Sequence, residues 1–397
     1  MSANTLSYNA IGTLVSNIVS QATGKAVMQP ITEADFLTVA NCGLLAGYDN
    51  LMASISQVLS KTVISNRPYT RRFKGLEADS IRWGNHVRKI NYVDRDWEDG
   101  SRLPITTGVA VDDQAPTKDD VLQTNFYGQN DVEIPWTIFS NQLDVAFESR
   151  EAFGAYISGL LQNISDMTEQ KHESLARAAL GGLMGAILSV NNPYQIVHLV
   201  TEYNTYVGNS PAKTLTELRA SNEYPAFVEW IYGRFAQVAS MLTERTTLYH
   251  QNVTNLSGAD KTLARHTPYA MQNIFISAAE RFQMESRVIA DIYHDNYLKM
   301  ATTEALNFWQ SSQTPDSIDI TPIYLDNDGS LKTGTAINQA NIFGMICDRE
   351  SVGYTTVNQR STSAAYNGKG EYQNFWLKFT DRYWIDQTEN AVIFIMD

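Results

Sequence analysis

Histidine, cysteine and clustered carboxylates carry most enzyme chemistry, and in this sequence they are few and scattered. The sequence contains no GxxxxGK phosphate loop, no GxGxxG motif opening a helix, no HExxH and no GxSxG motif. The histidines do not have the spacing of a zinc site; they are His86, His172, His198, His250, His266 and His294. We therefore predict no catalytic residue, no cofactor and no bound metal ion.

Two acidic stretches come closest to a cation site. The first is a polar loop that carries Asp94, Asp96, Glu98 and Asp99. Nothing fixes the geometry of these carboxylates, so a solvated loop is the favoured interpretation. The second is DNDG at 326–329, which resembles the start of a calcium loop, but with Gly329 in the sixth position the first ligand would be Tyr324. A tight turn is the better interpretation, because Asn, Asp and Gly favour turns.

The two cysteines, Cys42 and Cys347, have no CxxC companion, which excludes a disulfide framework and indicates a reducing compartment. The first residues lack the basic and then apolar pattern of a signal peptide. The longest apolar run, residues 178–190, is too short to span a bilayer. We therefore expect synthesis in the cytoplasm and no membrane partner.

The charge balance limits the partners further. The chain has 397 residues, a formal net charge of -13 and only 18% charged residues. An acidic chain does not adhere to phosphate backbones or anionic membranes, since these partners need an excess of Lys and Arg. A low density of charge leaves uncharged surface for protein contacts. Any relation to nucleic acid should therefore be containment and not neutralisation.

Helical periodicity is strongest in three stretches. Residues 8–23 place Ile11, Leu14, Val15 and Ile18 on one face, and Gly24 ends the pattern. Residues 35–59 indicate two helices. A stripe with steps of three or four runs from 149 to 188, marked by Phe153, Ile157, Leu160, Ile164, Met167, Leu175 and Ala179. An unbroken helix of that length would be about 60 Å long.

Period-two patterns at 80–93 and 131–139 predict two strands around a long polar tip. Such an extended hairpin is marginal alone, because two strands cannot bury a face. Basic and aromatic residues alternate at its start and also at 67–75, which favours contact with an acidic neighbouring copy over a nucleic-acid groove. The candidate contact residues are Arg82, Trp83, Arg88, Lys89, Tyr92, Asp94, Arg95 and Trp97.

The second half of the chain mixes helices and strands. Thr214 and Glu217 match a capping box, and 225–242 has helical spacing. Short buried strands are predicted at 271–277, 317–325 and 341–347. Residues 366–397 are rich in aromatic and β-branched residues up to the end of the sequence. Such an ending predicts strands built into a core.

Four segments carry a resemblance to a known family. They are FGMICDRESVGYTT at 343–356 with its Asp348–Arg349 pair, the closing EYQNFWLKFTDRYWIDQTENAVIFI, NIFISAAERFQMESRVIADIYHDNYL and LNFWQS. With the order of elements, they resemble the major capsid proteins of tailed bacteriophages, most like those of short-tailed podoviruses. The resemblance implies an α+β, Hong Kong 97 phage-type major capsid fold.

The resemblance also implies a division of the chain. Residues 1–34 would form an N-terminal arm, 35–79 the first part of the P domain, and 80–138 the E-loop. Residues 139–195 would be P domain with the spine helix, 196–335 the A domain, and 336–397 the C-terminal strands that complete the P and A domains. Some proteins of this fold cross-link a lysine of the E-loop. Lys89 and Lys118 are the lysines between 80 and 138, but nothing selects a partner, so we predict no such bond.

The implied function is an icosahedral shell of hexamers and pentamers around a double-stranded DNA genome. The DNA would be confined and not specifically bound. A scaffolding protein and a portal would be partners, and assembly in the bacterial cytoplasm would place the chain in the virion capsid. Three alternatives remain open: an encapsulin-type nanocompartment, an enzyme with a dispersed site, and a virion decoration module.

Overall fold

The computed structural model describes residues 8–24, 35–36, 38–40, 42, 69, 71–78, 87–93, 120–256, 259–282 and 302–397. The helices are α1 (Tyr8–Thr23), η1 (Lys74–Leu76), α4 (Ser140–Ala146), α5 (Arg150–Val190), α6 (Leu199–Val207), α7 (Leu215–Ala220), α8 (Tyr224–Met241) and η2 (Tyr269–Met271). Of the two helices predicted over 35–59, the described residues 35–36, 38–40 and 42 are helical, and residues 43–59 lie outside the described residues.

The first eight strands are β1 (Val87–Tyr92), β2 (Val121–Phe126), β3 (Gly128–Phe139), β4 (Ile196–His198), β5 (Val253–Leu256), β6 (Ala259–Lys261), β7 (Gln272–Ser277) and β8 (Thr302–Leu306). The others are β9 (Ile318–Ile320), β10 (Ile323–Leu325), β11 (Leu331–Thr333), β12 (Ile337–Gln339), β13 (Ile342–Asp348), β14 (Val352–Ser363), β15 (Tyr372–Ile385) and β16 (Ala391–Ile395). The fold is thus a mixture of helices and sheets, as predicted.

Helix α5 is the longest element and confirms the helix predicted at 149–188. The Ser149 side chain caps its start by accepting a hydrogen bond from the Ala152 N–H, which satisfies one of the free amides of the first turn. Asn191 ends it in the left-handed conformation, with φ of 54°, which asparagine tolerates better than most residues. At the rise of an α-helix, its 41 residues span about 60 Å.

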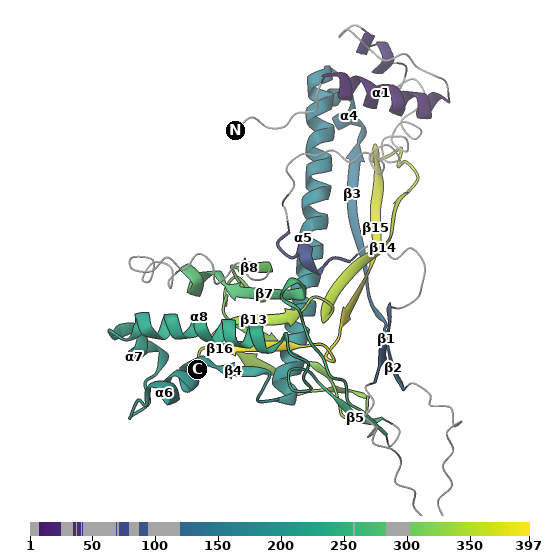
Figure 1. The fold of residues 1–397 in the computed structure, drawn as a ribbon. Helices are drawn as coiled ribbons and strands as arrows, with labels where there is room; N and C mark the ends of the chain where they lie inside the picture. The colour runs from purple at the N-terminus through teal and green to yellow at the C-terminus, as the bar shows by residue number, and fades with distance from the viewer. Residues whose placement is uncertain are drawn as a thin grey trace, which may run out of the picture.

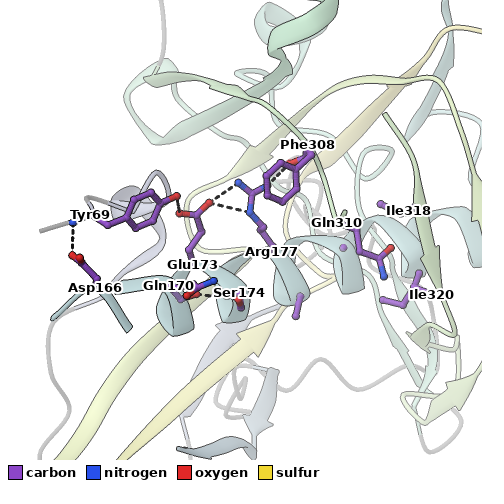
Figure 2. A pocket seen from close by; sticks show the side chains of 12 residues that line it. Tyr69, Asp166, Gln170, Glu173, Ser174, Arg177, Phe308, Gln310, Ile318 and Ile320 are labelled. Atoms are coloured by element: carbon purple, nitrogen blue, oxygen red, sulfur yellow. Dashed lines mark hydrogen bonds and ion pairs between the residues drawn. The ribbon is translucent and has the colours of Figure 1, made fainter. Parts of the chain in front are cut away.

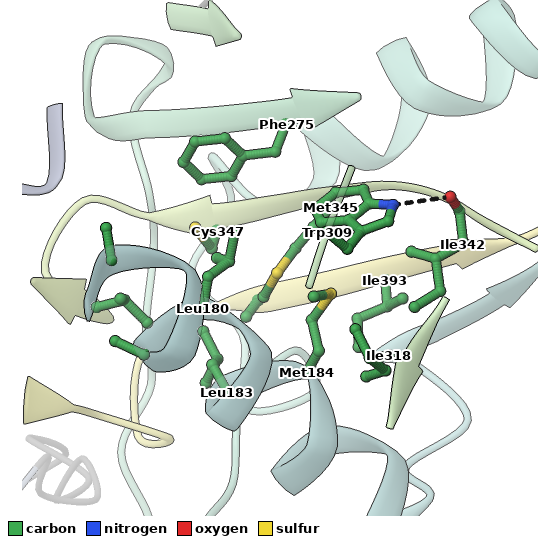
Figure 3. Close-up of a cluster of buried hydrophobic side chains, with 14 of the residues drawn as sticks. Leu180, Leu183, Met184, Phe275, Trp309, Ile318, Ile342, Met345, Cys347 and Ile393 are labelled. Carbon is green, nitrogen blue, oxygen red and sulfur yellow. Dashed lines mark hydrogen bonds between the residues drawn. The ribbon is translucent and has the colours of Figure 1, made fainter. Parts of the chain in front are cut away.

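One half of α5 supports a five-stranded sheet in the order β4-β16-β13-β7-β8. Leu180, Leu183 and Met184 of the helix pack against Met345 of β13 and Ile393 of β16 (Figure 3). In the same cluster the Trp309 indole N–H donates to the Ile342 carbonyl oxygen at 3.1 Å. The buried indole is therefore satisfied, and the cluster is otherwise apolar.

The opposite face of this sheet is covered by α8. Ile393 of β16 faces the α5 side, whereas its neighbour Phe394 belongs to the cluster on the α8 side, as the alternation of a strand requires. The Phe394 ring stacks on Phe235 of α8 at 3.8 Å between centroids. Strand β16 lies between β4 and β13 with all five residues buried. The apolar C-terminal residues are thus an inner strand of the core, as predicted.

The other half of α5 supports a three-stranded sheet in the order β14-β15-β3 (Figure 1). Ile164 and Met167 of the helix pack on Ile134, Leu377 and Phe379 of the sheet. Helix α1 packs near the start of α5 through the four apolar residues predicted from the sequence, and Gly24 with φ of 68° follows it. A single helix therefore forms the common support of two sheets and the N-terminal helix.

The pairing predicted for the extended hairpin was wrong. Strand β1 pairs with β2, while β3, which includes the predicted strand at 131–139, pairs with β15 over twelve residues. Strand β15 offers an apolar partner face, where Phe375 stacks on Trp136 at 5.8 Å. Pro135 has no amide proton, which suits the position of β3 at the sheet edge. The predicted hairpin tip lies outside the described residues.

Among the described helices, α5 alone is long and apolar enough by composition to cross a membrane. Of its most apolar window, 67% is buried inside the protein. These side chains face the two sheets, so the packing described above accounts for the apolar composition. The helix has the features of a core helix.

Candidate functional site

The β1–β2 hairpin has two faces of opposite character. The strands are antiparallel, with Tyr92 opposite Val121 and Asn91 opposite Leu122. Residues alternate between faces along each strand. Lys89, Asn91 and Leu122 therefore share one face, which we call the inner face because it packs on the rest of the chain.

The inner face is held by one apolar and one ionic contact. Leu122 is 6% exposed and packs against Val253 of β5 and Leu263. Lys89 lies two residue pairs away along the hairpin, and its ammonium contacts the turns that follow β13 and β15. These two contacts fasten the base of the hairpin to the body of the protein.

The ionic contact is a cluster of three carboxylates and two cations, which we call the Lys89 cluster. The Lys89 Nζ lies 2.5 Å from Glu389 Oε1, 3.0 Å from Asp386 Oδ2 and 3.1 Å from Glu350 Oε2. Arg265 adds a second cation at 2.9 Å from Glu389. Asp386 is 1% exposed and Glu350 59% exposed. The cluster thus begins at the surface and ends in the interior.

Burial and charge act in opposite directions in this cluster. Burial alone favours the neutral amine, but Asp386 and Glu389 outweigh it and raise the pKa of Lys89. Burial also raises the pKa of the Glu389 carboxyl, while Lys89 and Arg265 oppose that shift. Lys89 is therefore a charged side chain held by carboxylates that have little access to water.

The other face of the hairpin, which we call the outer face, exposes apolar side chains. Ile90 is 53% exposed, Tyr92 70% and Val121 48%. Tyr92 and Val121 are directly opposite, and Ile90 lies two residues along the same strand, so the three side chains are neighbours. Both faces mix polar and apolar residues, since Arg88 is also exposed on the outer face and Leu122 is buried on the inner face. The distinctive feature of the outer face is that three large apolar side chains are exposed next to one another.

A second polar network ties residues 69–78 to α5. The Arg71 guanidinium contacts Glu169 at 2.8 Å, Nδ1 of His172 at 3.0 Å, and Glu77. Because the guanidinium donates, His172 accepts at Nδ1 and carries its proton on Nε2. That nitrogen lies 3.4 Å from Asp381. These buried groups join the segment, the helix and the three-stranded sheet.

This network brings a histidine, an aspartate and a hydroxyl together, as in a hydrolase. The Thr356 hydroxyl, however, donates to Asp381 at 2.8 Å. Its oxygen also lies 3.4 Å from His172 Nε2, where the protonated nitrogen donates, so the histidine does not accept the hydroxyl proton. His172 is 7% exposed and Asp381 1% exposed. A nucleophile needs a base that accepts its proton and an approach for substrate. The arrangement is that of a buried structural network.

A cavity of about 630 Å³ lies beside the middle of α5 (Figure 2). Its polar walls are already paired. Glu173 accepts from the Tyr69 hydroxyl at 2.6 Å and from Arg177 at 2.5 Å, and the Gln310 side chain bonds both backbone groups of Asp319. Arg177 lies over the Phe308 ring at 3.8 Å. The cavity therefore offers few free polar groups to a substrate.

Among the described residues, no group of three or more His, Cys, Asp or Glu has an arrangement that could hold a metal ion. The predicted turn at 326–329 is present between β10 and β11, and Gly329 has a φ of 79° there. The carboxylates at 94–99 lie outside the described residues.

The comparisons with known proteins identify the family. A family model described as Phi29-like phage major capsid protein matches residues 17–395. This chain belongs to that family. It is a shell-forming capsid protein of a phage and a component of the virion capsid, and the resemblance noted in the sequence is confirmed.

Solved capsid structures have the fold of this capsid protein. A chain of the Staphylococcus phage Andhra capsid structure has a TM-score of 0.51 at 11% identity, covering 85% of this chain and 87% of that chain. A chain of the bacteriophage P68 structure of the head fiber and inner core protein gp22 has a TM-score of 0.53 at 11% identity, with the same coverage. A search of curated proteins finds no match.

Three of the eight predicted contact residues of this capsid protein lie in the described part of the chain. Arg88 and Tyr92 are exposed on the outer face, and their contact with a neighbouring subunit stays a prediction. Lys89 binds carboxylates of its own chain and is 18% exposed, and its contact with a neighbouring subunit stays a prediction. The remaining five lie outside the described residues: Arg82, Trp83, Asp94, Arg95 and Trp97.

The sequence reasoning missed residues on both faces. Ile90 and Val121 were not recognised as outer-face residues, although the period-two pattern around Tyr92 could have indicated Ile90. The acids that bind Lys89 are about 300 residues away in the sequence, and only the three-dimensional fold brings them together. The basic stretch at 67–75 likewise finds its acidic partners within the chain, since Arg71 binds Glu77 and Glu169.

Proposed function

We propose that copies of this capsid protein join through the outer face of the β1–β2 hairpin, which a neighbouring copy covers in the shell. The supporting observation is the group of three large apolar side chains exposed next to one another on that face. Exposed Ile90, Tyr92 and Val121 lower the free energy of the assembled state when a partner removes them from water. A second copy is the partner, since a shell protein meets its own surface at every contact.

Each such contact is modest. The three side chains are already partly buried, so covering them contributes about 1 kcal/mol each. A closed shell repeats the contact in every copy, and each copy is held by several neighbours at once. The lattice is therefore stable although a pair of isolated copies is not.

We propose the finer assignments on the basis of the family. The hairpin with the segment between its strands is the E-loop at 80–138, α5 is the spine helix within the P domain at 139–195, and residues 196–335 form the A domain. Residues 1–34, 35–79 and 336–397 are the N-terminal arm, the first part of the P domain and the closing strands. Copies form hexamers and pentamers of an icosahedral shell of a short-tailed phage.

We further propose that the shell encloses double-stranded DNA by confinement, as the net charge of -13 opposes adhesion to phosphates. A scaffolding protein and a portal assist assembly in the host cytoplasm. The chain has no catalytic role, which the family and the paired polar groups of the α5 cavity favour over an enzyme. The matched phage family also favours a viral shell over an encapsulin-type compartment.

The experiment is a Tyr92→Asp variant compared with a Tyr92→Phe control. The new carboxylate would have to be desolvated in every contact, so we expect the yield of shells to fall at least tenfold. The phenylalanine keeps the apolar ring and should assemble like the wild type. Sedimentation and electron microscopy measure shells, and circular dichroism checks the fold of the subunit. Normal shells from Tyr92→Asp would contradict the role of the outer face.

A further inference from the structure

Strand β2 continues directly into β3 and approaches β15, and two side-chain contacts on the inner face further attach the β1–β2 hairpin to the rest of the described chain. Leu122 of β2 inserts between Val253 and Leu263, and Lys89 of β1 enters its carboxylate cluster. A single attachment allows a two-stranded ribbon to pivot, whereas two attachments fix its direction. The apolar contact has no directional preference, so the ionic contact with its defined partners supplies the orientation.

The carboxylates that receive Lys89 are themselves held in place. Asp386 Oδ1 accepts from the Thr388 backbone N–H at 2.9 Å and from its hydroxyl at 2.6 Å. Arg265 donates to the Thr388 carbonyl at 3.0 Å and pairs with Glu389. The receiving groups are therefore part of a hydrogen-bonded turn between β15 and β16. Asp386 and Glu389 are therefore held in place before Lys89 binds them.

The two turns that supply the carboxylates of the Lys89 cluster belong to both sheets. Glu350 lies between β13 of the five-stranded sheet and β14 of the three-stranded sheet. Asp386 and Glu389 lie between β15 of the three-stranded sheet and β16 of the five-stranded sheet. Lys89 thus attaches the hairpin to the two turns that connect the sheets.

We propose that Lys89 is a positioning residue that sets the direction of the hairpin, so that every copy presents its outer face at the same angle to its neighbour. The inference rests on the proposed function of the outer face. A closed shell needs one repeated contact geometry. A hairpin that is free to pivot would lose conformational entropy on assembly in every copy, which weakens the contact. The Lys89 cluster removes that cost before assembly.

The obvious test variant, Lys89→Met, is unsuitable alone. It would leave Asp386 and Glu389 buried without their cation, and such an uncompensated charge is strongly destabilising. The triple variant Lys89→Met, Asp386→Asn, Glu389→Gln removes the charge of Lys89 and of its two buried partners with little change in shape. Arg265 and Glu350 keep their charges, and both side chains reach solvent. Replacing a complete buried ion pair in this way is often neutral for stability. Lys89→Arg, which keeps the charge, is the conservative control.

The measurement is the distance distribution between spin labels at Gln123→Cys on the hairpin and Thr362→Cys on β14, in a Cys42→Ser background. Both label sites are exposed, and the remaining Cys347 is buried. Unassembled subunits are used, so the result does not depend on shell formation. We expect a narrow distribution for the wild type and for Lys89→Arg, and at least a twofold broader one for the triple variant.

Shell yield and thermal unfolding complete the test. The triple variant should unfold within a few degrees of the wild type and yet form at least tenfold fewer shells. An unchanged narrow distribution in the triple variant would overturn the proposal. If the distribution broadens while Tyr92→Asp still assembles normally, the positioning by Lys89 stands and the role of the outer face falls. The two failures are therefore distinguishable.

Discussion

Lys89 and Ile90 are neighbours in β1, yet the lysine points into the protein and the isoleucine points to solvent. Residue type alone predicts the opposite, because lysine is rarely buried and isoleucine usually is. The lysine is stable in the interior because it forms ion pairs with Asp386 and Glu389. Since side chains alternate along a strand, Ile90 then points outward. This pair is the residue-scale basis for our proposal that another copy covers the outer face.

Glu304 of β8 is a second residue whose surroundings change its chemistry. Burial raises the pKa of its carboxyl to about 7; Glu173 adds to the shift, and Arg72 and Arg177 oppose it. The folded state therefore keeps a proton that the unfolded state has lost. The stabilisation from this group is fully present below the unfolded pKa of 4.5 and is lost as the pH rises to about 7.

Glu304→Gln should remove this dependence. The full shift corresponds to about 3 kcal/mol, but the side chain is partly exposed, so solvent screening reduces the expected effect to about 1 kcal/mol. The wild type should lose about 1 kcal/mol of unfolding free energy between pH 5 and pH 8 because of this group, and the variant should not. The difference in unfolding free energy, variant minus wild type, should therefore rise by about 1 kcal/mol from pH 5 to pH 8. Urea denaturation of unassembled subunits at both pH values measures it. An identical difference between variant and wild type at the two pH values would refute the assignment.

At the scale of elements, helix α5 is the part that the sequence predicts best. Its apolar stripe is nearly continuous from Phe153 to Ala179, about seven turns, and Ser149 supplies the start signal. The strands at 272–277, 342–348 and 391–395 are also predictable, since they are short apolar runs. The local pattern is sufficient for these elements because it shows which residues of each element face the core.

Strand pairing is the element-scale feature that local pattern does not predict. Strand β3 pairs with β15, more than 230 residues later, and not with the earlier strand that shares its period. Sequence spacing favours the near partner because a short loop costs less entropy. Packing of β3 against the apolar face of β15 outweighs this entropic cost. The sequence of β3 alone does not show which strand supplies that face.

The N-cap of α5 provides a test at this scale. Ser149→Ala removes the side chain that accepts from the Ala152 N–H at 3.1 Å, so we expect a loss of about 1 kcal/mol in unfolding free energy. Ser174→Ala, an exposed position within the same helix, is the matched control. Its hydroxyl bonds to the Gln170 carbonyl, a contact that does not favour the helix. Chemical denaturation compares the two, and equal stability of both variants would show that the cap contributes nothing.

At the scale of the whole molecule, α5 carries the two sheets at different heights, and the hairpin projects beside the lower one (Figure 1). An extended shape with exposed apolar faces is costly for a solitary protein and suited to a lattice. The low charge density and the resemblance to phage capsid proteins already indicated, from the sequence alone, a protein that assembles into a lattice. The sequence did not indicate which face of the hairpin is free, because that depends on ion pairs between distant segments.

The most direct test of the account is a cryo-electron microscopy reconstruction of virions that carry this chain. The account predicts a closed shell built from many copies, in which Ile90, Tyr92 and Val121 of each copy are buried against another copy. It also predicts Lys89 in the same intrachain cluster in every copy. A wall made of another polypeptide, or one in which these three side chains remain open to solvent, would contradict it.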